Sequence, residues 1–242
     1  PTIYIAFTPD EEVGNGTLHF NYQYFNVDFA YTIDGGPINF INYENFNAAS
    51  ATVTVNGKSI HPGSAKNKMV NSLMVGMEFD QLLPVNCRPE YTEGYEGFNH
   101  LNDVEGSVNK TTMSYIIRNH DFEQFEKQKQ DFIRIKDFLN EKYGYEIINL
   151  EIVDSYRNMK ELILPHPEIL NYPSEALKAF NLSPVMEPIR GGTDGARLSY
   201  EGVLCPNLGT GSYNHHGPME FADITDMNLM VDIIYYMLTI IK

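Results

Sequence analysis

The pattern of apolar and polar positions differs between the two ends of the chain and its middle. At the start, the mostly apolar run at residues 2–8 predicts a strand buried on both faces, and residues 29–33 repeat this pattern. The first run leads into the triplet Asp-Glu-Glu at 10–12, and the second leads into Asp34. Because ligands bind beyond the carboxyl ends of strands in open α/β sheets, we expect these carboxylates to share one crevice.

In the middle of the chain, some segments alternate apolar and polar residues, as half-exposed strands do, and others space their apolar residues as helices do. The expected strands are 49–55, one within 94–108, 112–118 and 147–153, and the expected helices are 66–83 and 121–143. The resulting order, β-α-β-β-α-β, is the split βαβ arrangement of a ferredoxin-like domain.

Helical patterns return after this segment, separated by glycine and proline turns. The expected helices are 167–180, 193–200 and 224–241. The last carries Met227, Met230, Ile234, Met237 and Ile241 on one stripe, which is typical of a helix that covers a sheet. We therefore predict an α/β fold in which a discontinuous domain, residues 1–45 and 155–242, is interrupted by an inserted α+β domain at 46–154.

Composition narrows the classes of partner. The 242 residues are 43% hydrophobic and 20% charged, which is typical of a folded globular chain. The net charge of −15 disfavours nucleic acid as a partner. Cys87 and Cys205 are too few for a disulfide framework, and the apolar stretch 227–241 is too short to span a bilayer. We expect a cytoplasmic protein that binds neither nucleic acid nor membrane.

The adjacent carboxylates at 10–12 are the first candidates for chemistry. Like charges at close range raise one another's pKa, and a bound metal ion removes that cost. An isolated acidic triplet is more often a solvated loop. The second carboxylate, Asp34, and the pair His215-His216 shift the interpretation toward zinc, which accepts Asp, Glu and His ligands.

Seven short runs, in this order, resemble peptidase T, a family of two-zinc tripeptide aminopeptidases related to other zinc aminopeptidases and aminoacylases. They are Phe-Thr-Pro-Asp-Glu-Glu-Val-Gly at 7–14, Tyr-Thr-Ile-Asp-Gly-Gly at 31–36, Glu-Asn-Phe-Asn-Ala-Ala at 44–49, His-Pro-Gly at 61–63, Glu-Gly-Tyr-Glu-Gly-Phe at 93–98, Pro-Ile-Arg-Gly-Gly-Thr-Asp-Gly at 188–195 and residues 213–220. The resemblance covers the chain from end to end and matches the larger, C-terminal part of the family. It implies a zinc-exopeptidase catalytic domain, lacking its N-terminal segment, with the inserted domain as a lid that also forms a homodimer.

The resemblance assigns roles to four residues of the discontinuous domain. Glu11 would be the general base that takes a proton from the attacking water, and Glu12 would bind one zinc ion. Asp34 would bind the second zinc ion. His216 would share the ion held by Glu12, although position 215 is histidine where the family suggests tyrosine, so either histidine remains a candidate ligand.

Three further residues are candidates for substrate contacts. The resemblance places His61 in the lid, near the oxyanion of the reaction intermediate and across a dimer interface. Arg118 and Arg190 are candidates for the terminal carboxylate of the peptide, which a guanidinium binds in bidentate fashion. The alternatives are a surface histidine, a strand-edge charge for Arg118 and a structural salt bridge for Arg190. We interpret residues 191–195 as a tight turn into a helix.

The family also supplies a His-x-Asp element and a bridging aspartate upstream of the position that corresponds to Pro1. Neither occurs within these residues. We therefore expect this chain alone to bind zinc incompletely and to hydrolyse tripeptides poorly. Two other interpretations stay open: a non-catalytic binding or dimerisation module, and a dipeptidase or aminoacylase of the same group.

Overall fold

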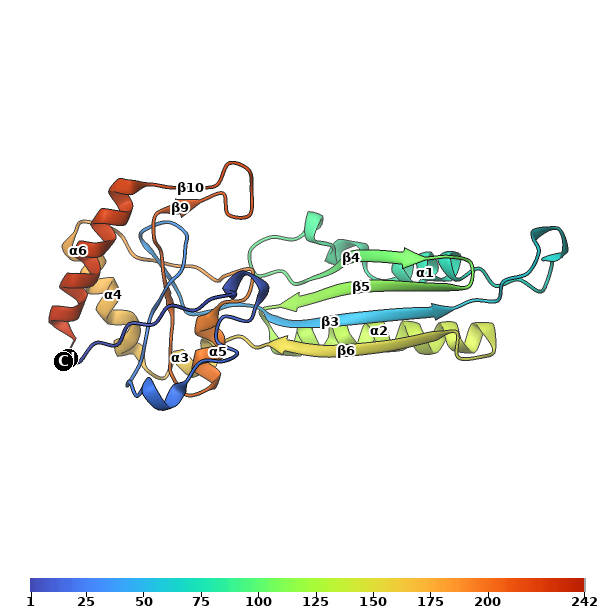
Figure 1. The fold of residues 1–242 in the computed structure, drawn as a ribbon, viewed down its shortest axis with the longest axis horizontal. Coiled ribbons are helices and arrows are strands. Elements are labelled where there is room, and N and C mark those ends of the chain that lie inside the picture. The colour runs from blue at the N-terminus through green and yellow to red at the C-terminus, as the bar shows by residue number, and fades with distance from the viewer. Residues whose placement is uncertain (242) are drawn as a thin grey trace. The chain divides into compact units, whose positions relative to one another are not determined.

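The computed structural model describes residues 1–241 and divides into two compact units. Unit 1 contains residues 1–45 and the chain from Arg157 onward, and unit 2 contains Phe46–Tyr156 (Figure 1). Each unit has its own hydrophobic core. The assignment of a catalytic role to the first unit and a lid role to the second stays a prediction.

Unit 2 is a four-stranded antiparallel sheet with two helices. Its elements are β3 (Asn47–Asn56), α1 (Ser72–Leu82), β4 (Phe98–Gly106), β5 (Lys110–Asn119), α2 (Phe122–Tyr143) and β6 (Ile148–Tyr156). The strand order is β4-β5-β3-β6, and every neighbouring pair is antiparallel. Both helices pack on the sheet, as Figure 1 shows. This arrangement confirms the mixed α/β fold class with a ferredoxin-like insertion.

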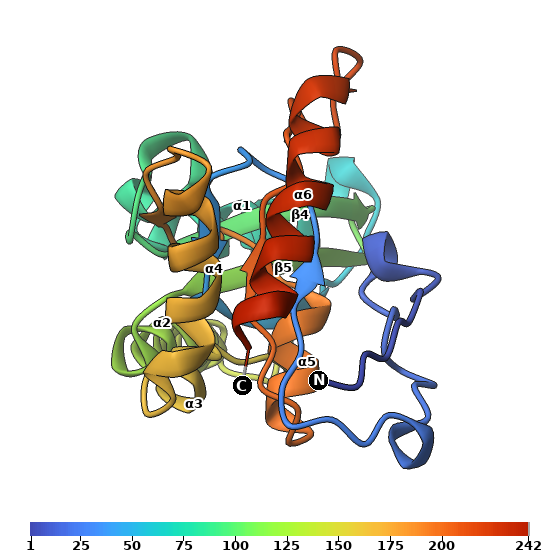
Figure 2. The same cartoon turned by 90° about the vertical axis from the view of Figure 1, so that its left-hand side faces the viewer.

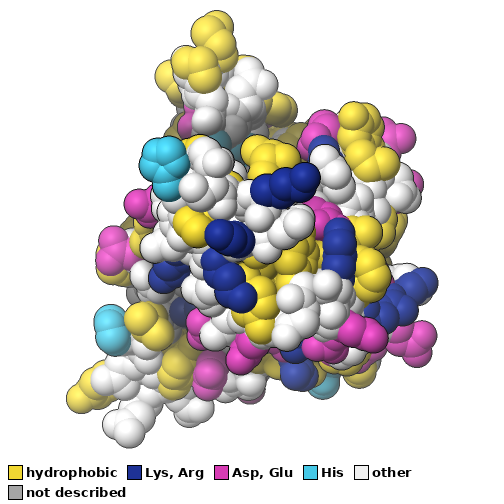
Figure 3. Space-filling model, turned by 90° about the vertical axis from the view of Figure 1, so that its right-hand side faces the viewer, with side chains coloured by type: hydrophobic (Ala, Val, Ile, Leu, Met, Phe, Trp, Pro, Cys, Tyr) yellow, Lys and Arg dark blue, Asp and Glu magenta, His cyan; other side chains and the backbone are white. Residues whose placement is uncertain are grey.

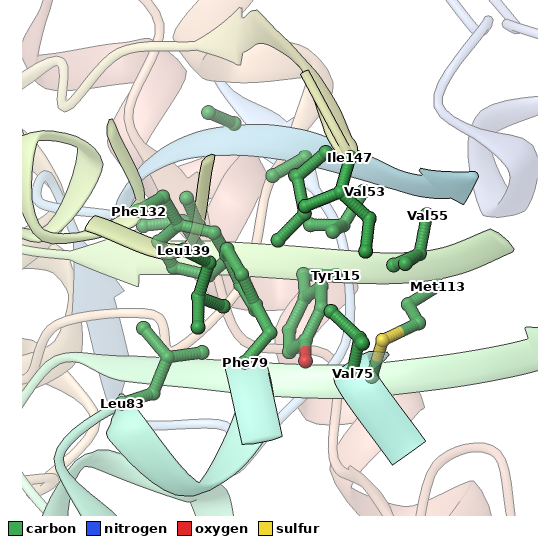
Figure 4. Close-up of a cluster of buried hydrophobic side chains, with 14 of the residues drawn as sticks. Val53, Val55, Val75, Phe79, Leu83, Met113, Tyr115, Phe132, Leu139 and Ile147 are labelled. Atoms are coloured by element: carbon green, nitrogen blue, oxygen red, sulfur yellow. The ribbon is translucent and has the colours of Figure 1, made fainter. Parts of the chain in front are cut away.

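The core of unit 2 lies between its sheet and its helices (Figure 4). Alternate residues of β5 point inward, among them Met113, Tyr115 and Ile117. Phe79 from α1 and Phe132 from α2 are fully buried against Tyr115, and the rings of Phe132 and Tyr115 lie 5.1 Å apart at 83°. An edge-to-face pair of this kind adds to the stabilisation from burial. Unit 2 therefore has the packing of an independently stable domain.

One stretch of unit 2 carries basic side chains and no acidic ones. No acidic residue occurs between Glu44 and Glu78, although the whole chain has a net charge of −15. Lys58, Lys66 and Lys68 lie in this stretch and are exposed. Figure 3 shows Lys and Arg side chains around a hydrophobic patch on one face. Local charge thus departs from the acidic average.

Unit 1 is built from short strands and from helices. Its elements are β1 (Thr32–Ile33), β2 (Phe40–Asn42), α3 (Lys160–Ile163), α4 (Pro167–Ala179), β7 (Val185–Met186), α5 (Asp194–Tyr200), β8 (Asn207–Leu208), β9 (Ser212–Tyr213), β10 (Phe221–Ala222) and α6 (Ile224–Ile240). The sheet order is β1-β8-β2-β7, with β1 parallel to β8 and β2 antiparallel to β8. Helices α4 and α6 contact each other (Figure 2). Ile41, Leu208 and Ile233 belong to the core of this unit.

Two sequence-based expectations for unit 1 are wrong. Residues 2–8 form no strand, and the side chains of Ile5 and Phe7 are 78% and 93% exposed. No described strand pairs with this run, so its β propensity has no hydrogen-bonded ladder to join. Of the run at 29–33, only Thr32–Ile33 is a strand.

The stripe predicted for α6 also differs in part. Met230 and Met237 are buried as expected, but Met227 is 49% exposed and Ile233 is buried. The helix therefore packs on a face rotated from the predicted stripe. Within residues 1–241, no helix combines the length and apolar character needed to cross a membrane.

Candidate active site

Glu11 and Glu12 lie in a single 3₁₀ turn of unit 1, Glu11–Val13. The turn is bounded by Asp10 and Gly14, whose φ angles of 61° and 74° are left-handed. Such angles are easy for glycine and tolerated by aspartate, so the sequence suits a tight reversal here. Gly14 N donates a hydrogen bond of 2.7 Å to Glu11 O. The turn leaves Glu11 half-buried and Glu12 exposed, so the two neighbours have different environments.

Asp34 follows β1 at the end of a parallel pairing with β8. Its backbone N donates a hydrogen bond of 3.2 Å to Leu208 O. The next two residues, Gly35 and Gly36, have φ angles of 67° and 84° and turn the chain sharply. Gly36 O then accepts hydrogen bonds from backbone N atoms of residues 210–212. The turn that carries Asp34 is thus tied to the segment that leads to the two histidines.

The two histidines take different positions. His216 Nε2 lies 3.2 Å from Glu12 Oε2, and both side chains are well exposed. His215 Nε2 lies 2.9 Å from Ser212 Oγ, and it is 3.2 Å from where a Cβ on Gly35 would stand. Three separate segments therefore meet here: His216 lies beside Glu12, and His215 lies beside the Asp34 turn.

Burial and like charges raise the pKa values of two carboxyl groups in this cluster. Glu11 has its pKa raised to about 7, first by burial and then by the negative charges of Asp34, Asp194 and Glu12, while His216 opposes the shift. The Asp34 side chain reaches solvent, yet loss of solvation, then Asp194 and Glu12, raise its pKa too. A carboxyl group with a pKa near neutrality is suited to accept and release a proton in catalysis.

The donor set fits part of a zinc site. Zinc takes four ligands in tetrahedral geometry and accepts both carboxylate oxygen and imidazole nitrogen. Glu12 and His216 supply one such pair. Within residues 1–241, no group of three or more His, Cys, Asp or Glu side chains is arranged to hold a metal ion. The pair therefore accounts for two donors of a site that needs more.

The residues predicted to contact substrate lie elsewhere in the chain. His61 is exposed in unit 2, and its Nδ1 accepts a hydrogen bond of 3.1 Å from Gly63 N. Arg118 projects from β5 of unit 2, and its guanidinium lies 5.8 Å from the centre of the Phe98 ring. Arg190 is in unit 1, directly after the β-bridge between Asn45 and Ile189. The cluster in unit 1 is thus formed by Glu11, Glu12, Asp34 and His216.

Sequence analysis missed one residue of the cluster, Asp194. It is the first residue of α5 and is only 9% exposed, and its charge acts on both Glu11 and Asp34. We interpreted residues 191–195 as a turn into a helix, which is where the structure begins α5. An acidic residue at a helix start is usually a solvated end group, so the pattern alone gave no signal for its burial.

Known proteins similar to this chain agree on one family. Residues 43–145 match the peptidase dimerisation domain family. Peptidase T of Clostridium perfringens is 50% identical over 240 residues, covering 99% of this chain and 58% of that protein. Peptidase T of Bacillus velezensis is 50% identical over 233 residues, covering 96% of this chain and 57% of that protein.

Two solved structures share the fold. The aminopeptidase PepT from Bacillus cereus matches with a TM-score of 0.81 at 17% identity, covering 95% of this chain and 62% of that one. A tripeptidase from Staphylococcus aureus matches with a TM-score of 0.84 at 19% identity, covering 96% and 62%. The chain spans 58% of the first of these curated relatives, and over nearly all of its own length it is similar to proteins of the peptidase T family.

Proposed function

We propose that this chain forms the larger part of a metal-dependent aminopeptidase that releases the N-terminal residue from tripeptides. The observation that carries the proposal is the meeting of three segments in unit 1, which brings Glu12 to 3.2 Å from His216 beside Glu11 and the Asp34 turn. The names of the relatives, peptidase T and a tripeptidase, support the substrate class.

Each residue of the cluster has a separate part in the proposed reaction. Glu12 and His216 would hold one zinc ion, Asp34 would hold the second, and further ligands would complete both sites. Bound zinc supplies a water of lowered pKa and polarises the scissile carbonyl. Glu11 would act as general base toward the attacking water and then pass the proton to the leaving amine. Its raised pKa, about 7, suits both steps.

Substrate contacts and assembly complete the proposal. His61 would approach the oxyanion of the intermediate, and Arg118 and Arg190 would be candidates for the terminal carboxylate of the peptide. Unit 2 would form a homodimer, which the match to the peptidase dimerisation domain supports. Sedimentation velocity over a range of concentrations tests this assembly, and a protein that stays monomeric throughout would contradict it.

The substitution Glu11→Gln tests the assignment of the base. It keeps the shape of the side chain and removes its basicity, so in a chimaera of this chain completed with the missing segment of a relative we expect kcat to fall by about 10²–10⁴-fold while the metal content stays unchanged. Glu175→Gln on the exposed side of α4 is the matched control and should leave both quantities unchanged. Unchanged turnover in Glu11→Gln would refute the assignment.

Zinc content tests whether the chain alone carries a complete site. After exhaustive dialysis we expect elemental analysis to find fewer than two zinc ions per chain, because the described ligands supply one close pair. A chimaera would join to this chain the segment of C. perfringens peptidase T that lies outside the matched region. That chimaera should hold two ions and hydrolyse tripeptides, whereas two tightly held ions in the chain alone would refute the incomplete site.

A second candidate is a dimerisation module without catalysis, which the match at 43–145 favours. A chimaera that dimerises but hydrolyses no peptide would support this candidate over the first. A third candidate is a dipeptidase or aminoacylase of the same group. Rates on free dipeptides, free tripeptides and N-blocked peptides separate these enzymes, since an aminoacylase cleaves N-blocked substrates, a dipeptidase prefers two residues and a tripeptidase prefers three.

A further inference from the structure

One oxygen of the Asp194 carboxylate is buried without a hydrogen-bond partner among the described residues. The residue is 9% exposed, and its Oδ2 atom is buried with no hydrogen bond. A buried carboxylate is costly unless it is paired or hydrogen-bonded. A buried polar atom without a hydrogen bond is rare in folded proteins and needs an explanation. We therefore expect Asp194 to have a role in addition to packing.

The backbone around Asp194 is fixed by polar contacts to the sheet of unit 1. Thr193 caps α5, and its Oγ1 accepts a hydrogen bond from Gly195 N and donates one of 2.9 Å to Asn207 Oδ1. Thr32, from β1, donates to the same Asn207 oxygen. Asn207 thus joins the start of α5 to the strand that leads to Asp34.

The Asp194 carboxylate closely approaches Gly16, which lies in the segment that carries the two glutamates. A Cβ on Gly16 would lie 2.2 Å from Asp194 Oδ2 and 2.6 Å from Oδ1, closer than the 3.0 Å that real Cβ atoms respect. The backbone of Gly16 is not left-handed, so the contact itself, and not the φ angle, demands glycine. Residues 12–15 are exposed, whereas Gly16 and Thr17 are buried. The segment thus returns to the body of unit 1 at the Asp194 carboxylate.

We propose that Asp194 is a positioning residue which, by packing against Gly16, holds the turn bearing Glu11 and Glu12 in place relative to Asp34. This inference rests on the proposed peptidase function for its kinetic consequence, but the contact itself does not depend on that function. The electrostatic effects agree with the placement. Asp194 is the strongest charged neighbour of Asp34 and the second strongest of Glu11.

Hydrogen exchange measured by mass spectrometry tests the contact in this chain. Asp194→Ala should raise exchange in the peptide covering residues 8–17 by about tenfold and leave peptides of unit 2 unchanged. Gly16→Ala should do the same, because its Cβ displaces the segment. In the double variant the removed carboxylate leaves room for the Cβ, so the combined effect should be smaller than the product of the single effects.

Ser199→Ala is the matched control on the same helix. Ser199 Oγ donates to Gly195 O and accepts from Cys205 N, so its loss weakens α5 without touching Gly16. If Ser199→Ala loosens residues 8–17 as much as Asp194→Ala does, general weakening of α5 explains the effect and the proposal fails. It also fails if the increase in hydrogen exchange in the double variant equals the product of the increases in Gly16→Ala and Asp194→Ala.

Kinetics in the chimaera test the consequence for the reaction. A turn displaced by about 1 Å costs on the order of 10²-fold in kcat and little in KM, since the substrate contacts are unaffected. Asp194→Glu, with its longer side chain, should not restore kcat. A chimaera that hydrolyses no peptide at all would overturn the proposed function. The positioning role would still be decided by whether the hydrogen-exchange effects of Gly16→Ala and Asp194→Ala depend on each other. An active chimaera whose kcat is unchanged by Asp194→Ala would overturn the inference.

Discussion

Gly209 offers a direct test of how tightly the Asp34 turn is held. It follows β8, and its backbone N donates a hydrogen bond of 3.1 Å to Phe40 O. A Cβ at this position would lie 1.8 Å from Pro37 O, an atom of the backbone that cannot rotate away. To reach the 3.0 Å limit for real Cβ atoms, the two backbone segments must separate by at least 1.2 Å. Gly209→Ala therefore has to displace the turn.

The cost of this displacement has two parts. Forcing extra volume into a packed position costs about 1–3 kcal/mol. Gly36 O also accepts hydrogen bonds of 3.1 Å from Thr210 N and 2.9 Å from Gly211 N, and each bond lost costs about 0.5–1.5 kcal/mol. If both bonds are lost, we expect a total loss of about 2–6 kcal/mol. Gly202→Ala is the control, because nothing lies within 4 Å of its Cβ position and only its φ of 98° strains it, by about 1–2 kcal/mol.

The assay must resolve the two units, since a chain of two units need not unfold in one step. Hydrogen exchange in rising urea, read separately on peptides of each unit, gives the stability of unit 1. We expect Gly209→Ala to lower the midpoint of unit 1 clearly more than Gly202→Ala does, and to leave unit 2 unchanged. Equal midpoints for the two variants would refute the close approach of Gly209 to Pro37.

Two further predictions concern unit 2. Phe132→Ala removes a fully buried ring on α2 and should destabilise the unit by about 3–5 kcal/mol. Phe138, on the same helix, is 51% exposed, so Phe138→Ala should cost far less. Urea denaturation measures both losses of stability, and similar losses would contradict the assignment of Phe132 to the core. Burial lowers the pKa of Lys129, but hydrogen bonds to Asp154 and Glu126 outweigh it and leave the pKa raised. This stabilisation is complete below the usual lysine pKa of 10.5 and is lost as pH rises through the higher folded value, so Lys129→Met should show a shallower loss of stability above pH 10.5 than the parent chain.

Most of the fold of unit 2 could be predicted because its helices and most of its strands carry a regular local pattern, whereas the sequence places β4 only somewhere within residues 94–108. Strand β5 alternates buried and half-buried residues along its length, and α2 has a capping aspartate, Asp121, and a left-handed glycine, Gly144, at its two ends. Its sheet and helices bury these faces against one another within one segment of chain. Periodicity alone therefore predicts both the elements and the faces they bury.

Unit 1 was predicted less well because its strands depend on distant partners. β8 has only two residues, and it pairs with β1 and β2, which lie about 170 residues earlier in the sequence. The run at 2–8 has a stronger β pattern than β8 and yet forms no strand. Pairing in the folded chain, and not propensity, decides which of these runs becomes a strand.

The sequence likewise points to only some residues of the candidate site. Glu11, Glu12, Asp34 and His216 are each picked out by a recognisable motif, and the structure brings Glu12 and His216 together, while the roles of all four stay predictions. Asp194 has no such signal, because it meets Gly16 only in the folded chain, more than 170 residues away in sequence. Motifs therefore predict candidate residues, whereas the contacts that position them emerge only from packing.

The carboxylates of this site link metal binding to the stability of unit 1. Asp34 and Asp194 raise the pKa of Glu11, and Asp194 with Glu12 raises that of Asp34, so each negative charge disfavours the others. A bound cation would offset this repulsion, and a ligand that binds only the folded state stabilises it in proportion to its affinity. Bringing these carboxylates together therefore lowers the stability of the cation-free chain and raises its affinity for a cation. The buried Asp194 adds to that cost while it holds the turn in place, which is why we expect positioning and metal affinity to change together when it is replaced.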